Sequence, residues 1–216
     1  MSDELEILRK LNFGTITEEE LMDIHLKFRN SYRVQLHLVM HPKFPQQFAI
    51  NIISHLYAVD LMRVSKNKRT NPLIRQKAEF EFQQKYMRLP LGEKLSYMKI
   101  APYSLLLHFI EEQNIQVVGA MLVNPYCTEE LVIRFINRKT PRHGFYEALL
   151  NTEWYKRPAV AEAIAVDAEA PIRMMIEVIP YLGKYTLRKI YENEETHDIV
   201  KKNIIDYYRN KRDRND

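Results

Sequence analysis

Two histidines at a spacing of four, His37 and His41, have the clearest potential for metal chemistry in this sequence. On a helix this spacing puts both imidazoles on one face, where they could bind zinc. The hydrolytic zinc motif also needs a glutamate directly after the first histidine, and position 38 is leucine. We therefore expect no metal site. The other histidines, which show no ligand spacing, are His25, His55, His108, His143 and His197.

The single cysteine, Cys127, is a second candidate for chemistry, as a nucleophile. Sequence spacing positions no base beside it, and a free cysteine is commonly a buried filler. The acidic runs at 17–21, 110–114 and 191–195 lie near expected helix ends and are typical of solvated faces. The five glycines are scattered and form no phosphate-binding loop. We expect no enzyme activity and no cofactor.

Clusters of lysine and arginine are the best candidates for a binding function. The segment 63–77, RVSKNKRTNPLIRQK, contains six basic residues and no acid, and NRKTPRHG at 137–144 forms a second cluster. Such clusters could bind phosphate groups or an acidic protein surface. The candidate partner-binding residues are Arg63, Lys66, Lys68, Arg69, Arg75, Lys77, Arg138, Lys139 and Arg142.

An internal repeat positions these residues. Shifting the chain by 126 residues places 34–77 on 160–203 without a gap, with Pro45 on Pro171 and coinciding apolar positions. A partial copy at 117–136 matches the start of the first copy at an offset of 83, which leaves 43 residues between it and the last copy. Helical units of about 40–47 residues are the scale of HEAT and armadillo repeats. The segment 86–116 is a degenerate unit or a spacer.

The repeat assigns a structural role to both histidines. His37 falls on Ala120 and Ala163, so the other copies fill its position with a small residue. His41 falls on Asn124 and Asp167, which favour turns and helix starts through hydrogen bonds between side chain and backbone. We therefore interpret His41 as a turn residue.

The turn charge reverses between the first and last copies. The basic segment 63–77 falls on KIYENEETHDIVKKN at 189–203, which is acidic at the matching turn. The fold cannot require both a positive and a negative side chain at the same aligned position. The turn is therefore exposed and free to vary, or each sign serves a partner.

Helix boundaries follow from turn and capping residues. Pro42 and Pro45 end one helix before His41 and start the next, because proline lacks an amide donor. A capping box at Thr17 and Glu20 predicts another helix start. We expect a helical cap at 1–27, one repeat domain at 28–208 with copies at about 28–85, 113–138 and 154–208, and a frayed charged tail at 209–216.

The pattern resembles HEAT-like repeats and the related leucine-rich-repeat-variant type. It is carried by His41-Pro42 with Pro45, by Asn124-Pro125 with Thr128, and by Asp167 with Pro171, each before an apolar stripe. The last copy departs from it, with Ala168 in place of a proline. The resemblance implies an all-α fold, a short α-solenoid of HEAT-like units. Proteins of this kind mostly bind other proteins, some bind nucleic acid, and a minority are enzymes, but no catalytic motif carries over.

Composition restricts the function further. The net charge of +4, from 32 basic and 28 acidic residues, is too small to indicate nucleic-acid binding by itself. One cysteine suits a reducing compartment, and the acidic start MSDELEILRKL lacks the apolar core of a secretion signal, so we expect a cytoplasmic protein without a membrane span. The sequence favours a non-catalytic scaffold that binds another protein. The alternative is a nucleic-acid-binding repeat protein that uses its basic turns. The oligomeric state stays open.

Overall fold

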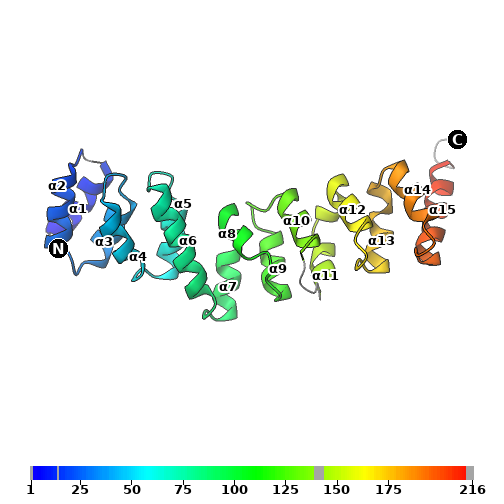
Figure 1. Cartoon of the computed structure of the whole chain (residues 1–216), viewed down its shortest axis with the longest axis horizontal. Coiled ribbons are helices and arrows are strands. Elements are labelled where there is room, and N and C mark those ends of the chain that lie inside the picture. The colour runs from blue at the N-terminus through cyan, green and yellow to red at the C-terminus, as the bar shows by residue number, and fades with distance from the viewer. Residues whose placement is uncertain (1, 14, 139–143, 213–216) are drawn as a thin grey trace. The chain divides into compact units, whose positions relative to one another are not determined.

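The computed structural model describes residues 2–13, 15–138 and 144–212, and it is built from α-helices (Figure 1). No strand occurs in these ranges, which confirms the all-α prediction. The chain divides into two compact units, Met1–Pro90 and Leu91–Asp216, called unit 1 and unit 2 below. This boundary lies inside 28–208, the segment that the sequence analysis treats as one domain.

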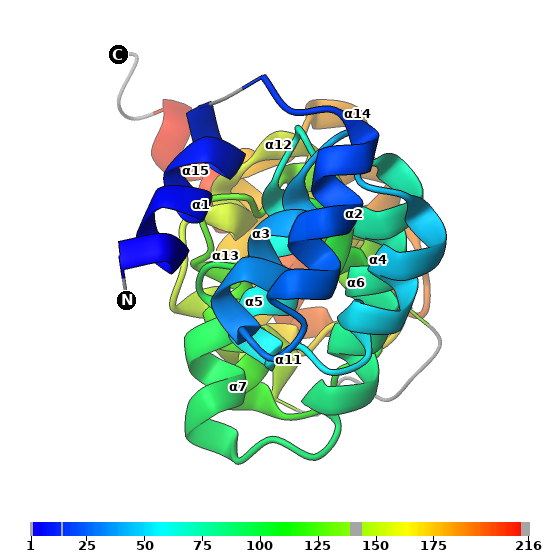
Figure 2. The same ribbon diagram turned by 90° about the vertical axis from the view of Figure 1, so that its left-hand side faces the viewer.

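The described residues of unit 1, 2–13 and 15–90, form six helices. The N-terminal pair, α1 and α2, contacts α3 (Figure 2), and α3 in turn contacts α4 and α5. The longest helix of the unit, α6, packs on α5 and α4. Extensive contacts thus join helices that are close in sequence. The bounds are α1 Ser2–Phe13, α2 Glu18–Lys27, α3 Tyr32–Met40, α4 Gln46–Ile53, α5 Ala58–Lys66 and α6 Pro72–Tyr86.

Unit 2 follows the same rule of local packing. Its helices contact the next helix or the one after it, as α9 contacts α7 and α11, and α13 contacts α12 and α15. Two short 3-10 helices, η1 and η2, interrupt the series. The bounds are α7 Leu91–Met98, α8 Tyr103–His108, α9 Ile115–Leu122, α10 Glu129–Ile136, α11 Phe145–Leu150, η1 Trp154–Lys156, α12 Pro158–Ala165, α13 Ile172–Val178, η2 Ile179–Tyr181, α14 Lys184–Glu192 and α15 Asp198–Arg212.

Helix bounds in the two units coincide at the offset found in the sequence. α5 and α14 begin and end 126 positions apart, and so do α6 and α15. α4 and α10 both begin and end 83 positions apart. The aligned segments therefore form the same helices in the same order.

In the part of the chain that the structure describes, one turn geometry recurs five times at the ends of helices. The first turn residue accepts a hydrogen bond on its side chain from the backbone N–H two residues later, and its carbonyl accepts from the N–H three residues later. At His41, Nδ1 accepts from Lys43 N at 3.2 Å, which confirms the turn role predicted for this histidine. The five first residues are His41, Asn67, Asn124, Asp167 and Asn193.

Two of these turns in unit 2 are also tied to preceding helices. The buried side chain of Asn124 donates through Nδ2 to the carbonyls of Met98 and Ala101, at 2.6 and 3.0 Å. The Tyr146 hydroxyl donates to Oδ2 of Asp167. These bonds let one polar residue shape its own turn and join a neighbouring helix, so the turn is held at a defined place in the unit.

Local capping explains where several helices start. Thr17 and Glu20 form the predicted capping box at the start of α2. Thr128 caps α10, its hydroxyl accepting from Leu131 N at 3.3 Å, and Asn71 caps α6 just before Pro72. Glu79–Phe82, which alternates as a strand would, lies within α6 because capping and packing on α5 favour helix.

The two ends of the chain differ in part from expectation. α15 continues to Arg212, so the tail expected from residue 209 is helical over its first four residues. Residues 213–216 lie outside the described ranges. Among the helices that the structure describes, none is both long enough and apolar enough to cross a membrane.

Candidate partner-binding site

The basic turn of unit 1 presents four cations to solvent. Arg63 and Lys66 lie in the last turn of α5, and Lys68 and Arg69 lie in the turn that follows; all four are exposed. The turn is shaped by Asn67, whose Oδ1 accepts from Arg69 N at 3.0 Å. Partial burial of the Lys66 side chain lowers the pKa of its ammonium. The structure thus brings together the first four predicted binding residues.

Arg75 and Lys77 follow on α6 and are half-buried. The Lys77 ammonium lies 2.7 Å from Oε1 of Glu81 and 4.9 Å from the centre of the Phe80 ring. A lysine with a partner one helical turn away is already neutralised in part. Lys77 therefore presents less positive charge to a partner, and both residues are less exposed than the basic turn.

Arg138 is buried, with 6% of its surface exposed, and it serves the fold of unit 2. Its Nη1 donates to the carbonyls of Ile110 and Glu112, at 3.2 and 2.7 Å. The guanidinium also lies over the rings of Phe135 and Phe145. Because no face of this group is open to a partner, we exclude Arg138 from the candidate surface. The neighbouring candidates Lys139 and Arg142 lie outside the described residues.

The acidic turn of unit 2 has the same geometry as the basic turn. Asn193 Oδ1 accepts from Glu195 N at 3.0 Å, the distance found at the equivalent Asn67. The side chains of Glu192, Glu194 and Glu195 are exposed. These three acids are not among the candidate residues of the sequence analysis, although the charge reversal is. The alignment at the offset of 126 could have identified them, since each falls on a basic residue.

A second reversal lies on the adjacent turn of each unit. Lys43 is exposed in the turn after α3, and its equivalent after α12 is the exposed Glu169. Burial, together with the positive charges of Arg69 and Lys43, lowers the pKa of the His41 imidazole. We call Lys43, Lys66, Lys68 and Arg69 the basic edge of unit 1. We call Glu169, Glu192, Glu194 and Glu195 the acidic edge of unit 2.

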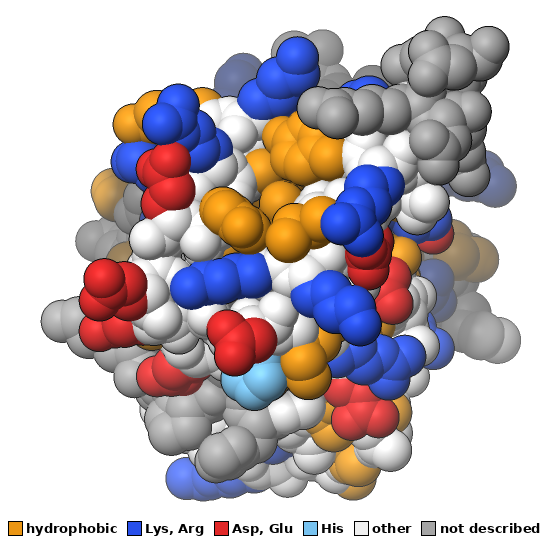
Figure 3. All heavy atoms as spheres, turned by 90° about the vertical axis from the view of Figure 1, so that its right-hand side faces the viewer, with side chains coloured by type: hydrophobic (Ala, Val, Ile, Leu, Met, Phe, Trp, Pro, Cys, Tyr) orange, Lys and Arg blue, Asp and Glu red, His pale blue; other side chains and the backbone are white. Residues whose placement is uncertain are grey.

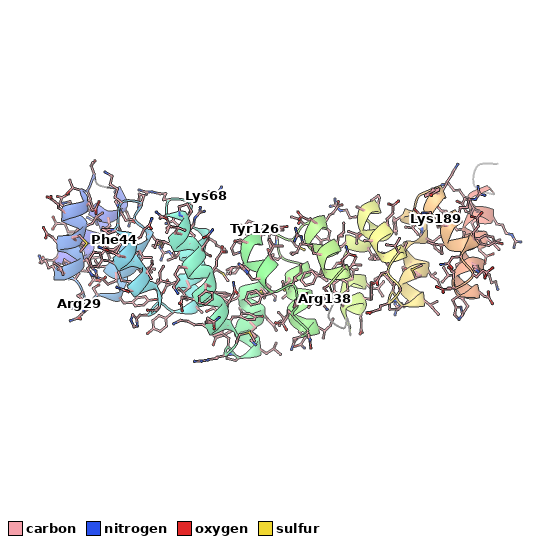
Figure 4. All side chains as sticks on the ribbon, viewed as in Figure 1. Arg29, Phe44, Lys68, Tyr126, Arg138 and Lys189 are labelled. Atoms are coloured by element: carbon pink, nitrogen blue, oxygen red, sulfur yellow. The ribbon has the colours of Figure 1, made fainter. Side chains whose placement is uncertain are left out.

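Figure 4 shows the orientation of the basic edge within unit 1. Lys68 projects from the end of the unit at which α5 ends and α6 begins. Arg29, in the turn between α2 and α3, projects from the opposite end. The same unit therefore offers exposed cations at two separate places, which provides a matched control for charge reversal.

A groove of about 580 Å³ borders the acidic edge in unit 2. It lies between the turn after α12 and the turn after α14, and its lining includes Val166, Ala170, Ile172 and Glu195. At the position of Ala170, unit 1 has Phe44, which is only 4% exposed and whose ring centre lies 5.7 Å from that of His25.

The face formed by α14 and α15 carries an apolar groove of about 420 Å³. Figure 3 shows hydrophobic side chains gathered there between basic ones. The groove is lined by Leu187, Arg188, Tyr191, Ile204, Ile205, Tyr208 and Arg209.

His37, one of the two histidines at metal-ligand spacing, and His25 are both held by hydrogen bonds of the fold. His37 Nδ1 donates to the carbonyl of Arg33 at 2.9 Å, within its own helix. His25 Nδ1 lies 2.7 Å from Oε1 of Gln35, and Gln35 donates to the carbonyls of His25 and Phe28. Within the described residues, no three His, Cys, Asp or Glu side chains group as metal ligands.

Acid is expected to destabilise unit 1 through His41. Burial, Arg69 and Lys43 lower the pKa of this imidazole in the folded chain. As the pH falls below about 6.5, the unfolded chain therefore takes up the proton first, and the free energy of unfolding falls by up to about 1.4 kcal/mol per pH unit. Urea unfolding between about pH 7.5 and 5.5, followed by circular dichroism, measures this loss.

The control is His41→Asn, because asparagine makes the same turn at position 124 without titrating. The variant should keep more of its stability at the acidic end than the unmodified chain does. Parallel pH profiles for the two proteins would contradict the assignment.

Cys127 is expected to react slowly in the folded chain. It is buried at the turn before α10, and this burial raises the pKa of its thiol to about 12. The thiolate is the reactive form, so the raised pKa leaves very little of it at neutral or mildly alkaline pH. Iodoacetamide labelling at about pH 8, followed by mass spectrometry, should be far slower without urea than with it. Equal rates would show that the thiol is accessible.

No protein-family model, curated protein or solved structure matches the chain.

Proposed function

We propose that this chain is a non-catalytic helical-repeat protein that binds another protein through its exposed turns. The observation that carries the proposal is the charge reversal between two turns of equal backbone geometry. Arg69 and Glu195 donate the same backbone hydrogen bond at the same distance of 3.0 Å, and their side chains are both exposed. Since the turn forms with either sign, the fold requires neither, and the proposal assigns the charge to the binding of a partner.

The repeat architecture supports this proposal. We propose that each unit is built of HEAT-like repeats stacked as an α-solenoid. The coinciding helix bounds, the recurrent turn and the packing of each helix on close neighbours in sequence all favour this arrangement. Repeat units of this type expose rows of turns along one edge, which suits partner binding. The single, buried Cys127 favours a reducing compartment, and we propose a cytoplasmic location.

A nucleic-acid-binding function is the alternative, and the four exposed cations Arg63, Lys66, Lys68 and Arg69 favour it. Two observations weigh against it. Arg138 is committed to backbone carbonyls, and the equivalent turn in unit 2 would repel phosphate. A protein with an acidic complementary surface is therefore the better partner for the basic turn.

Site-specific photocrosslinking tests the proposal. A photoreactive amino acid placed at Lys68 in cells of the native source should crosslink to a discrete protein, and the same group at Arg29 should not. The adduct at position 68 should disappear when Lys66 and Arg69 are changed to glutamate. Identical adducts from both positions, or none from either, would overturn the proposal.

Fluorescence anisotropy with labelled DNA and RNA tests the alternative. A salt-dependent increase that is lost in K66E/K68E/R69E would favour nucleic acid. The matched control K27E/R29E/R88E removes the same charge at other exposed positions of unit 1. Absence of binding at low salt, or equal loss in both variants, would reject the basic turn as a nucleic-acid site.

A further inference from the structure

The two charged edges of this chain are complementary in sign and alike in backbone. The basic edge and the acidic edge each contain four exposed charges, and these occupy aligned positions, each 126 residues apart. The carbonyls of Asn67 and Asn193 accept turn bonds from Thr70 and Thr196, at 3.0 and 3.2 Å. The fold thus presents two similar surfaces with opposite charge.

We infer that the basic edge of unit 1 binds the acidic edge of unit 2 in a second copy of the chain. This inference rests on the proposed function, because it names a partner for the same turn. Every copy supplies both surfaces, so the partner is always present at equal concentration. A head-to-tail contact of this kind closes into a dimer when it is reciprocal and extends into longer assemblies when it is not.

The charges available indicate a weak, salt-sensitive association. Single exposed ion pairs contribute little, and several acting together mainly steer and orient two surfaces. On the acidic edge, Glu192 already lies 2.7 Å from Nε of Arg188, and Lys189 is close by on α14, over the Tyr185 ring. These cations reduce the acidic potential of the edge.

An apolar contact accompanies the charges. Leu73, at the start of α6 beside the basic turn, is 59% exposed. The groove next to the acidic edge offers an apolar lining that includes Ile172 and Val166, and Val166 is 78% exposed. Leu73 of one copy, next to the basic edge, would lose its exposed area in this groove of another copy.

Sedimentation analysis of charge-reversed chains tests the inference. At about 50 mM salt the unmodified chain should form dimers or larger assemblies in a concentration-dependent way, and it should dissociate at about 500 mM salt. Reversing the charge of either the basic edge or the acidic edge should weaken the association at least about tenfold. The two reversed chains are K43E/K66E/K68E/R69E and E169K/E192K/E194K/E195K.

Two further samples test whether it is the complementarity of the two edges that controls the association. A chain that carries both sets of reversals restores complementarity and should associate again. An equimolar mixture of the two singly reversed chains should form mixed assemblies, although neither chain associates alone. Circular dichroism of each variant verifies that it is folded, and K27E/R29E/R88E controls for charge removed elsewhere in unit 1.

The groove is tested separately by Ala170→Phe, which introduces the residue that unit 1 accommodates at the equivalent position. We expect this variant to fold and to associate several-fold more weakly, because the ring fills the space without changing a charge. Association as strong as in the unmodified chain would remove the groove from the contact.

Other outcomes overturn the inference. A monomer at low salt and high concentration would do so, and so would an association that survives both single reversals or that nuclease treatment abolishes. If the chain is monomeric while position 68 still crosslinks to a different protein, self-association is rejected and the proposed function stands. If position 68 crosslinks to nothing and the chain is monomeric, both the self-association and the proposed partner-binding function are rejected.

Discussion

Replacing Asn124 with alanine is expected to lower the free energy of unfolding of unit 2 by about 3 kcal/mol. The side chain is 3% exposed and makes three hydrogen bonds to backbone groups, at Met98, Ala101 and Tyr126. Alanine leaves two buried carbonyls and one amide without these partners, and an unsatisfied buried group is costly. Urea unfolding followed by the fluorescence of Trp154, the single tryptophan, reports on this unit.

Asn193→Ala provides the matched control. Asn193 makes the same turn bond, to Glu195, but its side chain is exposed and no bond to a preceding helix is seen for it among the described residues. Water can replace its partner, so we expect a loss of about 0.5–1 kcal/mol. Equal losses for the two variants would show that the bonds from Asn124 to Met98 and Ala101 add no stability.

The second large effect is expected at Arg138. Arg138→Ala should cost about 3 kcal/mol, because it removes charge-assisted hydrogen bonds to Ile110 and Glu112 and the packing on two aromatic rings. Arg138→Lys should be intermediate, since lysine keeps the charge without the planar fork. The same fluorescence-detected unfolding measures both variants.

Arg134→Ala is the control for Arg138. Arg134 lies one turn earlier, on α10, and its side chain is 54% exposed in an ion pair with Glu130. Exposed pairs of this spacing contribute little to stability, so we expect only a slight loss. If Arg138→Ala were as mild as this control and instead weakened partner binding, Arg138 would belong to the binding surface after all.

Much of the helical framework could be predicted because its signals are local. Thr17 and Glu20 lie three residues apart, so a capping box can be read from the sequence. His41 could be assigned to a turn because the repeat aligned it with an asparagine and an aspartate, which make the same bond. In these cases the residues that decide the structure are close together in sequence or recur at one offset.

The candidate site could be predicted only in part. The exposure of Lys66, Lys68 and Arg69 follows from the sign reversal, which a buried position would not tolerate. The burial of Arg138 could not be predicted, because it depends on carbonyls 26 and 28 residues earlier in the chain. An arginine in a basic cluster looks the same in sequence whether its partner is solvent or the backbone.

The local packing of the helices also bears on how fast each unit folds. Since helices such as α5 and α6 meet across one short turn, few native contacts require the closure of a long loop. Low contact order of this kind is associated with folding in microseconds to milliseconds. Each recurrent turn bends the chain back on itself at low entropic cost. We therefore expect folding to begin at several of these hairpins and to spread between neighbours.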